Sequence, residues 1–125
     1  MSQATTTIET LFDDYIAIWN ETDPARRRSM IDRVWAADAT YRDPVLNGAG
    51  RDAIDAMIAG FQAAYPGHTF ARQGEAICEG DAYRFEWILK NPEGETQIVG
   101  VDVAEIDASG QLRSIVGEFD LPAPE

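Results

Sequence analysis

The segment Thr40-Tyr41-Arg42-Asp43-Pro44 combines residue types that could do chemistry, above all Asp43. Tyr41 and Arg42 favour an extended backbone, and Pro44 disfavours a helical conformation for the residue before it. A strand places Tyr41 and Asp43 on one face, so a core-facing Tyr41 also brings the Asp43 carboxylate inward. Because inward carboxylates are uncommon unless they are paired, hydrogen-bonded or used, Asp43 is the first candidate site residue.

Two further polar residues interrupt apolar patterns. Tyr15 is the polar member of a helical stripe between Ile8 and Trp19, so its hydroxyl is carried into the core and needs a partner there. Asp102 interrupts an apolar strand and is in phase with Gly100 and Ala104. The elements that carry these residues must therefore bring their side chains to a common interior.

The chain has 125 residues, which predicts a single domain over 1–125 with an ordered core of about 8–121. Its formal net charge of −12 argues against nucleic-acid or membrane-surface partners. The lone Cys78 allows neither an internal disulfide nor a multi-cysteine zinc site. The first ten residues lack a signal-peptide pattern, and no apolar run is long enough to span a bilayer, so we expect a cytoplasmic protein.

Helical signals dominate the first half of the chain. After the helix that ends at Trp19, Asp23-Pro24 begins a second helix that runs to about Ala36. A third helix is predicted over 52–65, and Pro66-Gly67 ends it. Three consecutive arginines at 26–28 are assigned to a solvated surface, and 47–50 is assigned to a loop.

The second half alternates like strands, at about 68–78, 82–90, 95–106 and 111–121, with turn signals between them. Short connections imply antiparallel neighbours. The pattern predicts an α+β domain in which a curved antiparallel sheet wraps against three helices, forming a cone with a pocket for a small apolar molecule. The apolar outer face at Val99, Val101 and Val103 predicts a homodimer through the sheet.

The chain resembles the nuclear transport factor 2-like superfamily, in its SnoaL-like and ketosteroid-isomerase-like branch. The residues that carry the resemblance are Tyr15-Ile16-Ala17-Ile18-Trp19-Asn20, Ala37-Asp38-Ala39-Thr40-Tyr41-Arg42-Asp43-Pro44, Gly50-Arg51-Asp52-Ala53-Ile54 and Val99-Gly100-Val101-Asp102. The resemblance covers nearly the whole chain and implies the cone-shaped fold. It does not select one activity, because this superfamily hosts isomerases, cyclases, hydratases and non-catalytic binders.

The isomerase branch implies three catalytic roles for this chain. Asp43 matches that family's proton-shuttling base, Tyr15 its tyrosine oxyanion donor, and Asp102 its protonated aspartic acid. In such a site the base removes a proton beside a carbonyl while two donors stabilise the enolate oxygen. The sequence departs from that pattern at Ile58, where the family often keeps a supporting tyrosine.

Other interpretations of these residues were compared. Limonene-epoxide-hydrolase-like members place an arginine and an aspartate two apart on a strand, a spacing that Arg84 and Glu86 resemble. However, Tyr83, Phe85 and Trp87 form the better inward face, which puts Arg84 and Glu86 outside, so this interpretation is set aside. Asp43 can also cap a turn, and Asp102 can form a buried structural pair with Tyr15 or Tyr41.

Two functional hypotheses follow. The first is a cofactor-independent isomerase or polyketide-cyclase-like enzyme with Asp43, Tyr15 and Asp102 as catalytic residues. The second is a non-catalytic ligand-binding or dimerisation domain. No cofactor or metal is predicted, since His68 is assigned to the surface or rim and Cys78 to a packed position without a base partner. The predicted ligand-binding side chains are aromatic or apolar: Trp19, Tyr41, Met57, Phe61, Phe85 and Trp87.

Overall fold

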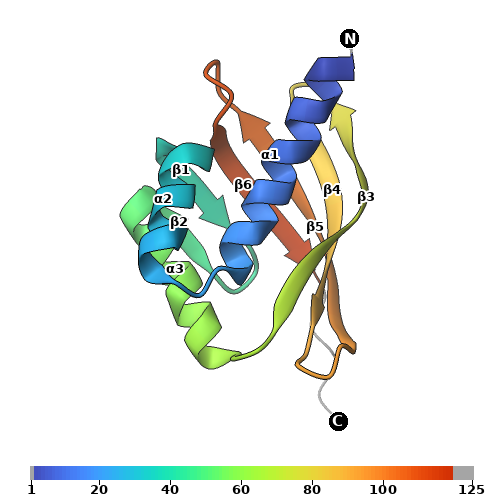
Figure 1. Cartoon of the computed structure of the whole chain (residues 1–125). Helices are drawn as coiled ribbons and strands as arrows, with labels where there is room; N and C mark the ends of the chain where they lie inside the picture. Colours follow the sequence, from blue (N-terminus) through green and yellow to red (C-terminus); the bar gives the residue numbers. More distant parts are fainter. Residues whose placement is uncertain (1, 120–125) are drawn as a thin grey trace.

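The computed structural model describes the backbone of residues 2–119 and the side chains of residues 8–119. In this part of the chain, three helices lie against a curved, open sheet of six strands (Figure 1). The predicted α+β class is therefore confirmed. The helices are α1 (Ser2–Asn20), α2 (Pro24–Val34) and α3 (Arg51–Ala64). The strands are β1 (Trp35–Arg42), β2 (Asn47–Ala49), β3 (Thr69–Glu79), β4 (Ala82–Lys90), β5 (Thr96–Ile106) and β6 (Leu112–Phe119).

The strand order is β2-β1-β6-β5-β4-β3, and the sheet is mixed rather than wholly antiparallel. The last four strands form the predicted antiparallel meander, because short turns join them. In contrast, β1 and β6 run parallel, with Arg42 opposite Val116. No hairpin connects these two strands, so turn patterns could not reveal their relative direction. Their pairing places the end of β1 beside the end of β6.

A short strand, β2, occupies most of the segment that was assigned to a loop. It pairs antiparallel with β1, with Tyr41 opposite Gly48 and Arg42 opposite Asn47. The chain therefore makes a tight turn at residues 43–46, immediately after β1. Asp43 begins this turn, and the backbone N–H of Asp43 donates to the carbonyl of Leu46 at 2.9 Å. The turn holds the candidate carboxylate at the end of a strand rather than within it.

Helix α2 begins as the sequence signals predict but buries one of its arginines. Asp23 accepts a hydrogen bond from the backbone N–H of Arg26 at 2.8 Å, as an N-cap residue does. Arg27 is only 5% exposed, so the solvated-surface assignment is wrong for this residue. Its guanidinium donates to Asp55 and Gln62 of α3, at 2.9 Å in both cases. A buried cation with charged and polar partners thus joins α2 to α3.

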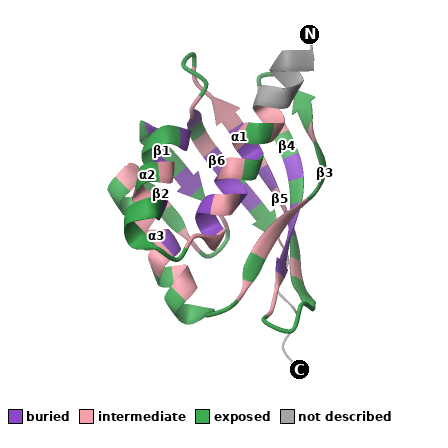
Figure 2. Ribbon diagram, viewed as in Figure 1, coloured by how far each residue is buried: buried purple, intermediate pink, exposed green. Residues whose placement is uncertain are grey.

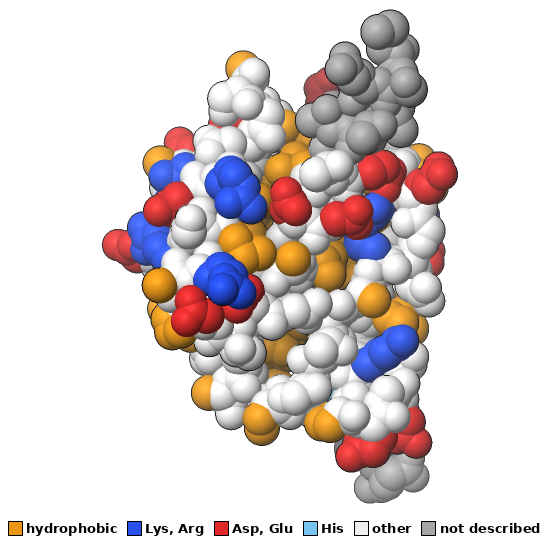
Figure 3. Space-filling model, in the orientation of Figure 1, with side chains coloured by type: hydrophobic (Ala, Val, Ile, Leu, Met, Phe, Trp, Pro, Cys, Tyr) orange, Lys and Arg blue, Asp and Glu red, His pale blue; other side chains and the backbone are white. Residues whose placement is uncertain are grey.

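The core lies between the three helices and the inner face of the sheet (Figure 2). Phe12 of α1 stacks on Phe85 of β4 with ring centroids 4.7 Å apart, and both rings are almost fully buried. Arginine side chains are interspersed with acidic ones on the outer surface of the helices (Figure 3). Among the described helices, none is long and apolar enough to cross a membrane.

Candidate functional site

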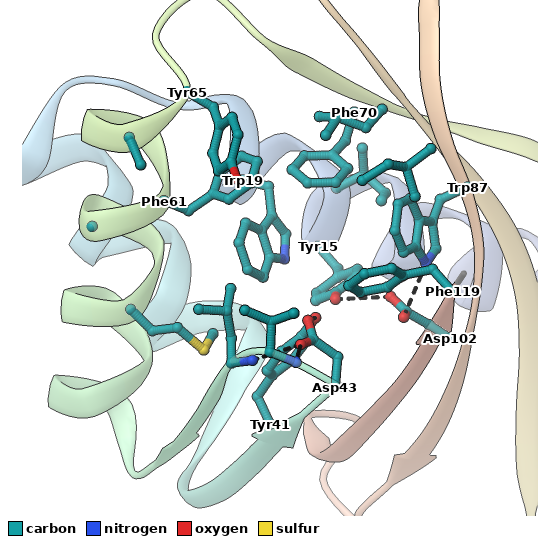
Figure 4. Close-up of a pocket in the computed structure, with 18 of the residues that line it drawn as sticks. Tyr15, Trp19, Tyr41, Asp43, Phe61, Tyr65, Phe70, Trp87, Asp102 and Phe119 are labelled. Atoms are coloured by element: carbon teal, nitrogen blue, oxygen red, sulfur yellow. Dashed lines mark hydrogen bonds between the residues drawn. The ribbon is translucent and has the colours of Figure 1, made fainter. Parts of the chain in front are cut away.

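A cavity of about 380 Å³ lies between the helices and the inner face of the sheet. This volume falls in the range of small-molecule sites. Two carboxyl groups lie among otherwise apolar and aromatic walls (Figure 4). None of the described lining residues is a lysine, an arginine or a histidine. The lining residues are Tyr15, Ile16, Trp19, Tyr41, Asp43, Val45, Leu46, Ala56, Met57, Gly60, Phe61, Ala64, Tyr65, Phe70, Trp87, Leu89, Ile98, Asp102 and Phe119.

The first carboxyl group, Asp102, projects from β5 and is 2% exposed. The Tyr15 hydroxyl donates to its Oδ2 at 2.9 Å, and the Trp87 indole N–H donates to its Oδ1 at 3.0 Å. Tyr15 reaches it because the helical stripe of α1 faces the sheet, where Tyr15 is 1% exposed. A phenol and an indole from distant segments therefore fix both oxygens of one buried acid.

Burial controls the proton affinity of Asp102. Desolvation raises the pKa of Asp102 from 3.8 to about 7, and the Asp43 charge also raises it. The hydrogen bonds from Tyr15 and Trp87 lower the pKa but do not cancel the effect of burial. Burial, followed by the Asp102 charge, raises the pKa of Tyr15, so the phenol keeps its proton. Asp102 therefore changes charge close to neutral pH.

The second carboxyl group, Asp43, is half-buried and is held by three donors. The Tyr41 hydroxyl donates to Asp43 Oδ2 at 2.5 Å. The backbone N–H groups of Val45 and Leu46 donate to Oδ1 at 2.8 and 2.7 Å. Asp43 thus caps the turn after β1, as the structural alternative anticipated, and also lines the cavity. Burial and the charges of Asp102 and Asp43 raise the pKa of Tyr41 well above its ordinary value.

Gly117 of β6 leaves room for the two acids to approach each other. It is opposite Asp102 in the β5–β6 register. A Cβ atom on Gly117 would lie 2.7 Å from Asp102 Oδ1 and 3.3 Å from the Asp43 Cβ. Gly100 makes a similar space, since a Cβ there would lie 2.2 Å from the Trp87 ring. Because these two glycines have no side chains, the carboxyl groups and the Trp87 ring fit at the polar end of the cavity.

The structure brings the three predicted catalytic residues to one cavity, together with most of the predicted ligand-binding residues. Trp19, Tyr41, Met57, Phe61 and Trp87 all line it. Phe85 does not, and this corrects its assignment to the lining. Its ring packs behind Tyr15, with centroids 5.9 Å apart, and against Phe12, so it belongs to the layer between α1 and the sheet.

Sequence reasoning left several wall residues unassigned. Phe70, two residues into β3, and Phe119, at the end of β6, line the cavity with Leu46 and Tyr65. Phe119 is in phase with Gly117, so the two-residue period of its strand could have indicated an inward side chain. Leu46 carried no periodic signal, because it lies in the turn between β1 and β2.

The remaining candidate residues lie elsewhere. Arg84 and Glu86 are exposed, as expected from the inward face of β4, and His68 does not line the cavity. Cys78 is exposed, so its assignment as a packed residue is wrong. In the described part of the chain, no group of three histidine, cysteine or acidic side chains is arranged to bind a metal ion. The cavity between the helices and the sheet joins apolar walls to polar side chains.

Comparison with known proteins extends this picture. Residues 12–115 match the SnoaL-like domain family. A comparison with curated proteins gave no match. Among solved structures, a "putative isomerase of the SnoaL-like family" from Agrobacterium tumefaciens is 35% identical. The alignment covers 92% of this chain and 98% of that chain, with a TM-score of 0.87.

Two more distant structures share the fold. An NTF2-like protein of unknown function from Exiguobacterium is 19% identical, with a TM-score of 0.72 over 88% of this chain and 98% of that chain. A "putative SnoaL-like polyketide cyclase" from Jannaschia is 16% identical, with a TM-score of 0.67 over 90% of this chain and 88% of that chain. From the match over residues 12–115 and the 35% identical relative, we conclude that this chain belongs to the SnoaL-like family.

Proposed function

We propose that the cavity binds a small, neutral carbonyl compound and that the protein is a cofactor-independent isomerase or cyclase. The observation that carries the proposal is a mostly apolar cavity containing two carboxyl groups with different surroundings. The buried Asp102 has its pKa raised to about 7, whereas the half-buried Asp43 accepts three hydrogen bonds. Neighbouring acids in unlike environments suit paired acid and base roles. Family members named as a putative isomerase and a putative polyketide cyclase support the same reaction class.

Asp43 is the base in this proposal. Its Oδ1 is held by the turn, and its Oδ2 retains a lone pair beside the Tyr41 bond. Oδ2 removes a proton from the carbon next to the carbonyl group. The C–H electron pair then forms a carbon–carbon double bond, and the carbonyl π pair moves to oxygen. Return of the proton to another carbon of the conjugated system gives isomerisation. Alternatively, the enolate carbon attacks a second carbonyl and closes a ring, the π pair of that carbonyl moves to its oxygen, and this oxygen takes the proton back from Asp43.

Asp102 and Tyr15 stabilise the charge that develops on oxygen. When Asp102 is ionised, the Tyr15 hydroxyl is used in donating to it. When Asp102 takes a proton on Oδ2, it becomes the donor, and Tyr15 can turn its own hydrogen toward the cavity. A pKa of about 7 lets this reversal occur near neutral pH. A donor aimed at the developing oxyanion in a dry site is a large source of catalysis.

Hydrogen exchange tests this proposal without the natural substrate. 2-Tetralone is a neutral bicyclic ketone with acidic hydrogens beside its carbonyl, and it is small enough for the cavity. In D₂O, we expect the wild-type protein to accelerate deuterium uptake at these carbons, measured by proton NMR. Asp43→Asn removes the base and keeps an acceptor for the turn amides. Asp38→Asn, at an exposed position of β1, is the matched control. Binding of 2-tetralone without faster exchange, or equal exchange in Asp43→Asn, would contradict the enzymatic proposal.

A non-catalytic binding domain is the alternative, and the Asp43 turn is the observation that favours it. Three donors to one carboxylate can have a purely structural purpose. In that case, Asp43→Asn leaves the affinity for 2-tetralone unchanged, and no protein variant alters the exchange rate. The exchange assay therefore separates the two hypotheses.

We also propose that a second copy of the chain covers the outer face of the sheet. Val99 is 56% exposed there, and Val101 is opposite Glu86 on one side and Glu118 on the other. These acids would approach their copies across a symmetric contact, so salt should strengthen association. Sedimentation showing a monomer at micromolar concentration and high salt would contradict this proposal. The exposed thiol of Cys78 suits a reducing compartment, and we expect the protein to act in the cytoplasm.

A further inference from the structure

The indole N–H groups of the three tryptophans have different surroundings. Trp87 donates to Asp102 at 3.0 Å. The Trp35 N–H is buried without a partner among the described residues, and Trp35 does not line the cavity. Trp19 lines the cavity and is 5% exposed. Its N–H makes no hydrogen bond of good geometry to a described residue, although it interacts with the Tyr15 side chain closely enough to lower the pKa of Tyr15. Trp19 therefore contributes an uncommitted donor to an otherwise apolar part of the wall.

The direction of this donor is visible in Figure 4. The Trp19 nitrogen is on the edge of the indole that points toward the Tyr15 hydroxyl and the Asp43 carboxylate. The interaction of Trp19 with the Tyr15 side chain, which lowers the pKa of Tyr15, agrees with this direction. The N–H is thus aimed at the polar end of the cavity, beside the proposed base.

Packing and hydrogen bonds hold Trp19 in this orientation. Its ring contacts those of Tyr41, Phe61 and Phe70, with centroid distances of 5.5, 5.7 and 5.3 Å. The Gln62 side-chain amide donates to the Trp19 carbonyl at 2.9 Å, and the buried Arg27 fixes that amide. The side chain of Asn20, the next residue, makes two hydrogen bonds to the backbone of Phe70, at 2.9 and 2.8 Å. The last turn of α1 is therefore joined to both α3 and β3.

The other donors near this end of the cavity are already used. Tyr15 and Trp87 donate to Asp102, and Tyr41 donates to Asp43. While Asp102 is ionised, a ligand carbonyl finds only acceptors at these positions. A buried carbonyl oxygen needs a donor, because leaving it unpaired costs free energy. Trp19 can supply that donor without rearrangement of either acid.

We propose that the Trp19 indole N–H donates to the carbonyl oxygen of the bound ligand and selects neutral compounds with one acceptor oxygen. The inference rests on the proposed function, because it takes the ligand to be the neutral carbonyl compound bound beside Asp43. Trp19 then acts as an oxyanion donor whose availability does not depend on the charge of Asp102. Anionic ligands are disfavoured, because the described lining contains two acids and no cationic side chain.

A pair of isosteric ligands isolates this hydrogen bond. 2-Tetralone and 2-methylenetetralin have the same shape, but the second has a =CH₂ group in place of the carbonyl oxygen. Trp19→Phe removes the N–H and keeps an aromatic ring, and Trp35→Phe removes an indole N–H outside the cavity as the matched control. Because each variant is compared using both ligands, a change in ring volume or stability cancels in the ratio of the two dissociation constants.

We expect the ketone preference of the wild type to fall about three- to ten-fold in Trp19→Phe and to persist in Trp35→Phe. We also expect the indole N–H resonance that is absent from Trp19→Phe to move downfield in the wild type with 2-tetralone but not with 2-methylenetetralin. This second measurement uses the unaltered protein, so it does not depend on how any variant folds.

Four outcomes would overturn the inference in distinguishable ways. An unchanged ketone preference in Trp19→Phe, with an unmoved indole resonance, would assign recognition to another donor. A preference that disappears above pH 7 in the wild type would assign it to protonated Asp102. If neither ligand binds, the proposed function fails together with this inference, whereas equal binding of both ligands contradicts only the role of Trp19.

Discussion

The cavity contains two phenol–carboxyl pairs that share the same chemistry but differ in how the chain builds them. Tyr15 and Asp102 come from α1 and β5, 87 residues apart, and both are almost fully buried. Tyr41 and Asp43 are two residues apart at the end of β1, and Asp43 also binds two backbone amides. The first pair depends on the tertiary fold, whereas the second is mostly a property of one turn.

The two acids differ in how far they are buried, although a phenol donates a hydrogen bond to each of them. Asp102 accepts a phenol and an indole donor, yet burial still raises its pKa to about 7. Asp43 keeps partial access to water and has more donors. A mostly apolar cavity thus receives one acid that can be neutral near physiological pH and one whose oxygens are held by a turn and a phenol.

The largest effect is expected for the base. Replacing Asp43 with asparagine should slow deuterium exchange into 2-tetralone by about 10²- to 10⁴-fold, because proton abstraction loses its acceptor. The dissociation constant for 2-tetralone should stay within about two-fold, since the hydrogen bond to the ligand oxygen does not involve Asp43. Exchange rates from NMR and affinities from calorimetry measure the two quantities. Comparable losses in both would indicate that Asp43 shapes the cavity rather than reacting.

The buried acid should make stability depend on pH. Its pKa is higher in the folded protein than in the unfolded chain, so the folded state binds more protons between about pH 4 and pH 7. The free energy of unfolding should therefore fall as pH rises through this window, by up to roughly 4 kcal/mol from Asp102. Asp102→Asn should remove this component of the slope in urea titrations. An identical slope in the variant would place the pKa of Asp102 near its unfolded value.

The substitution Gly117→Ala tests whether Asp102 and Asp43 need the room that this glycine leaves between them. Gly117→Ala places a methyl group 2.7 Å from Asp102 Oδ1, so the backbone or the acid must shift. We expect a loss of about 1–3 kcal/mol in unfolding free energy, as for other overpacked sites. Gly60→Ala is the control, because a Cβ there meets no atom within 4 Å. Equal stability of the two variants would show that the acids tolerate separation.

Removing each phenol hydroxyl compares the pairs directly. Tyr15→Phe leaves a buried acid with one donor fewer and should cost about 1–3 kcal/mol while raising the pKa of Asp102 further. Tyr41→Phe should cost about 1 kcal/mol or less, because the turn amides still hold Asp43. Thermal and urea unfolding of both variants provide the measurement. The reverse order of stabilities would mean that the local pair, not the buried one, holds the fold together.

Local patterns predicted much of this molecule. The stripe of α1, the Asp23-Pro24 helix start and the alternation of β4 each encode their own structure over a few residues. Asp43 and Asp102 stood out because charged side chains interrupt inward-facing positions. The family resemblance assigned Asp102 and Tyr15 to one site, which no local pattern does.

The features that sequence reasoning missed all depend on contacts between distant segments. The parallel pairing of β1 with β6 has no hairpin signal. Arg27 was assigned to the surface because its partners Asp55 and Gln62 come from α3. The space at Gly117 matters only because Asp102 lies opposite it in the neighbouring strand. Phe85 was assigned to the cavity because alternation shows which face of a strand a residue is on, but not what covers that face.

The turn after β1 links ligand entry to the position of the proposed base. Val45 and Leu46 line the cavity, Val45 is 60% exposed, and the amides of both residues bind Asp43. Any displacement of these two residues to admit a molecule therefore carries the carboxylate with it. Because the same two residues form part of the wall and support the base, a substitution that loosens the turn should impair ligand binding and proton abstraction together.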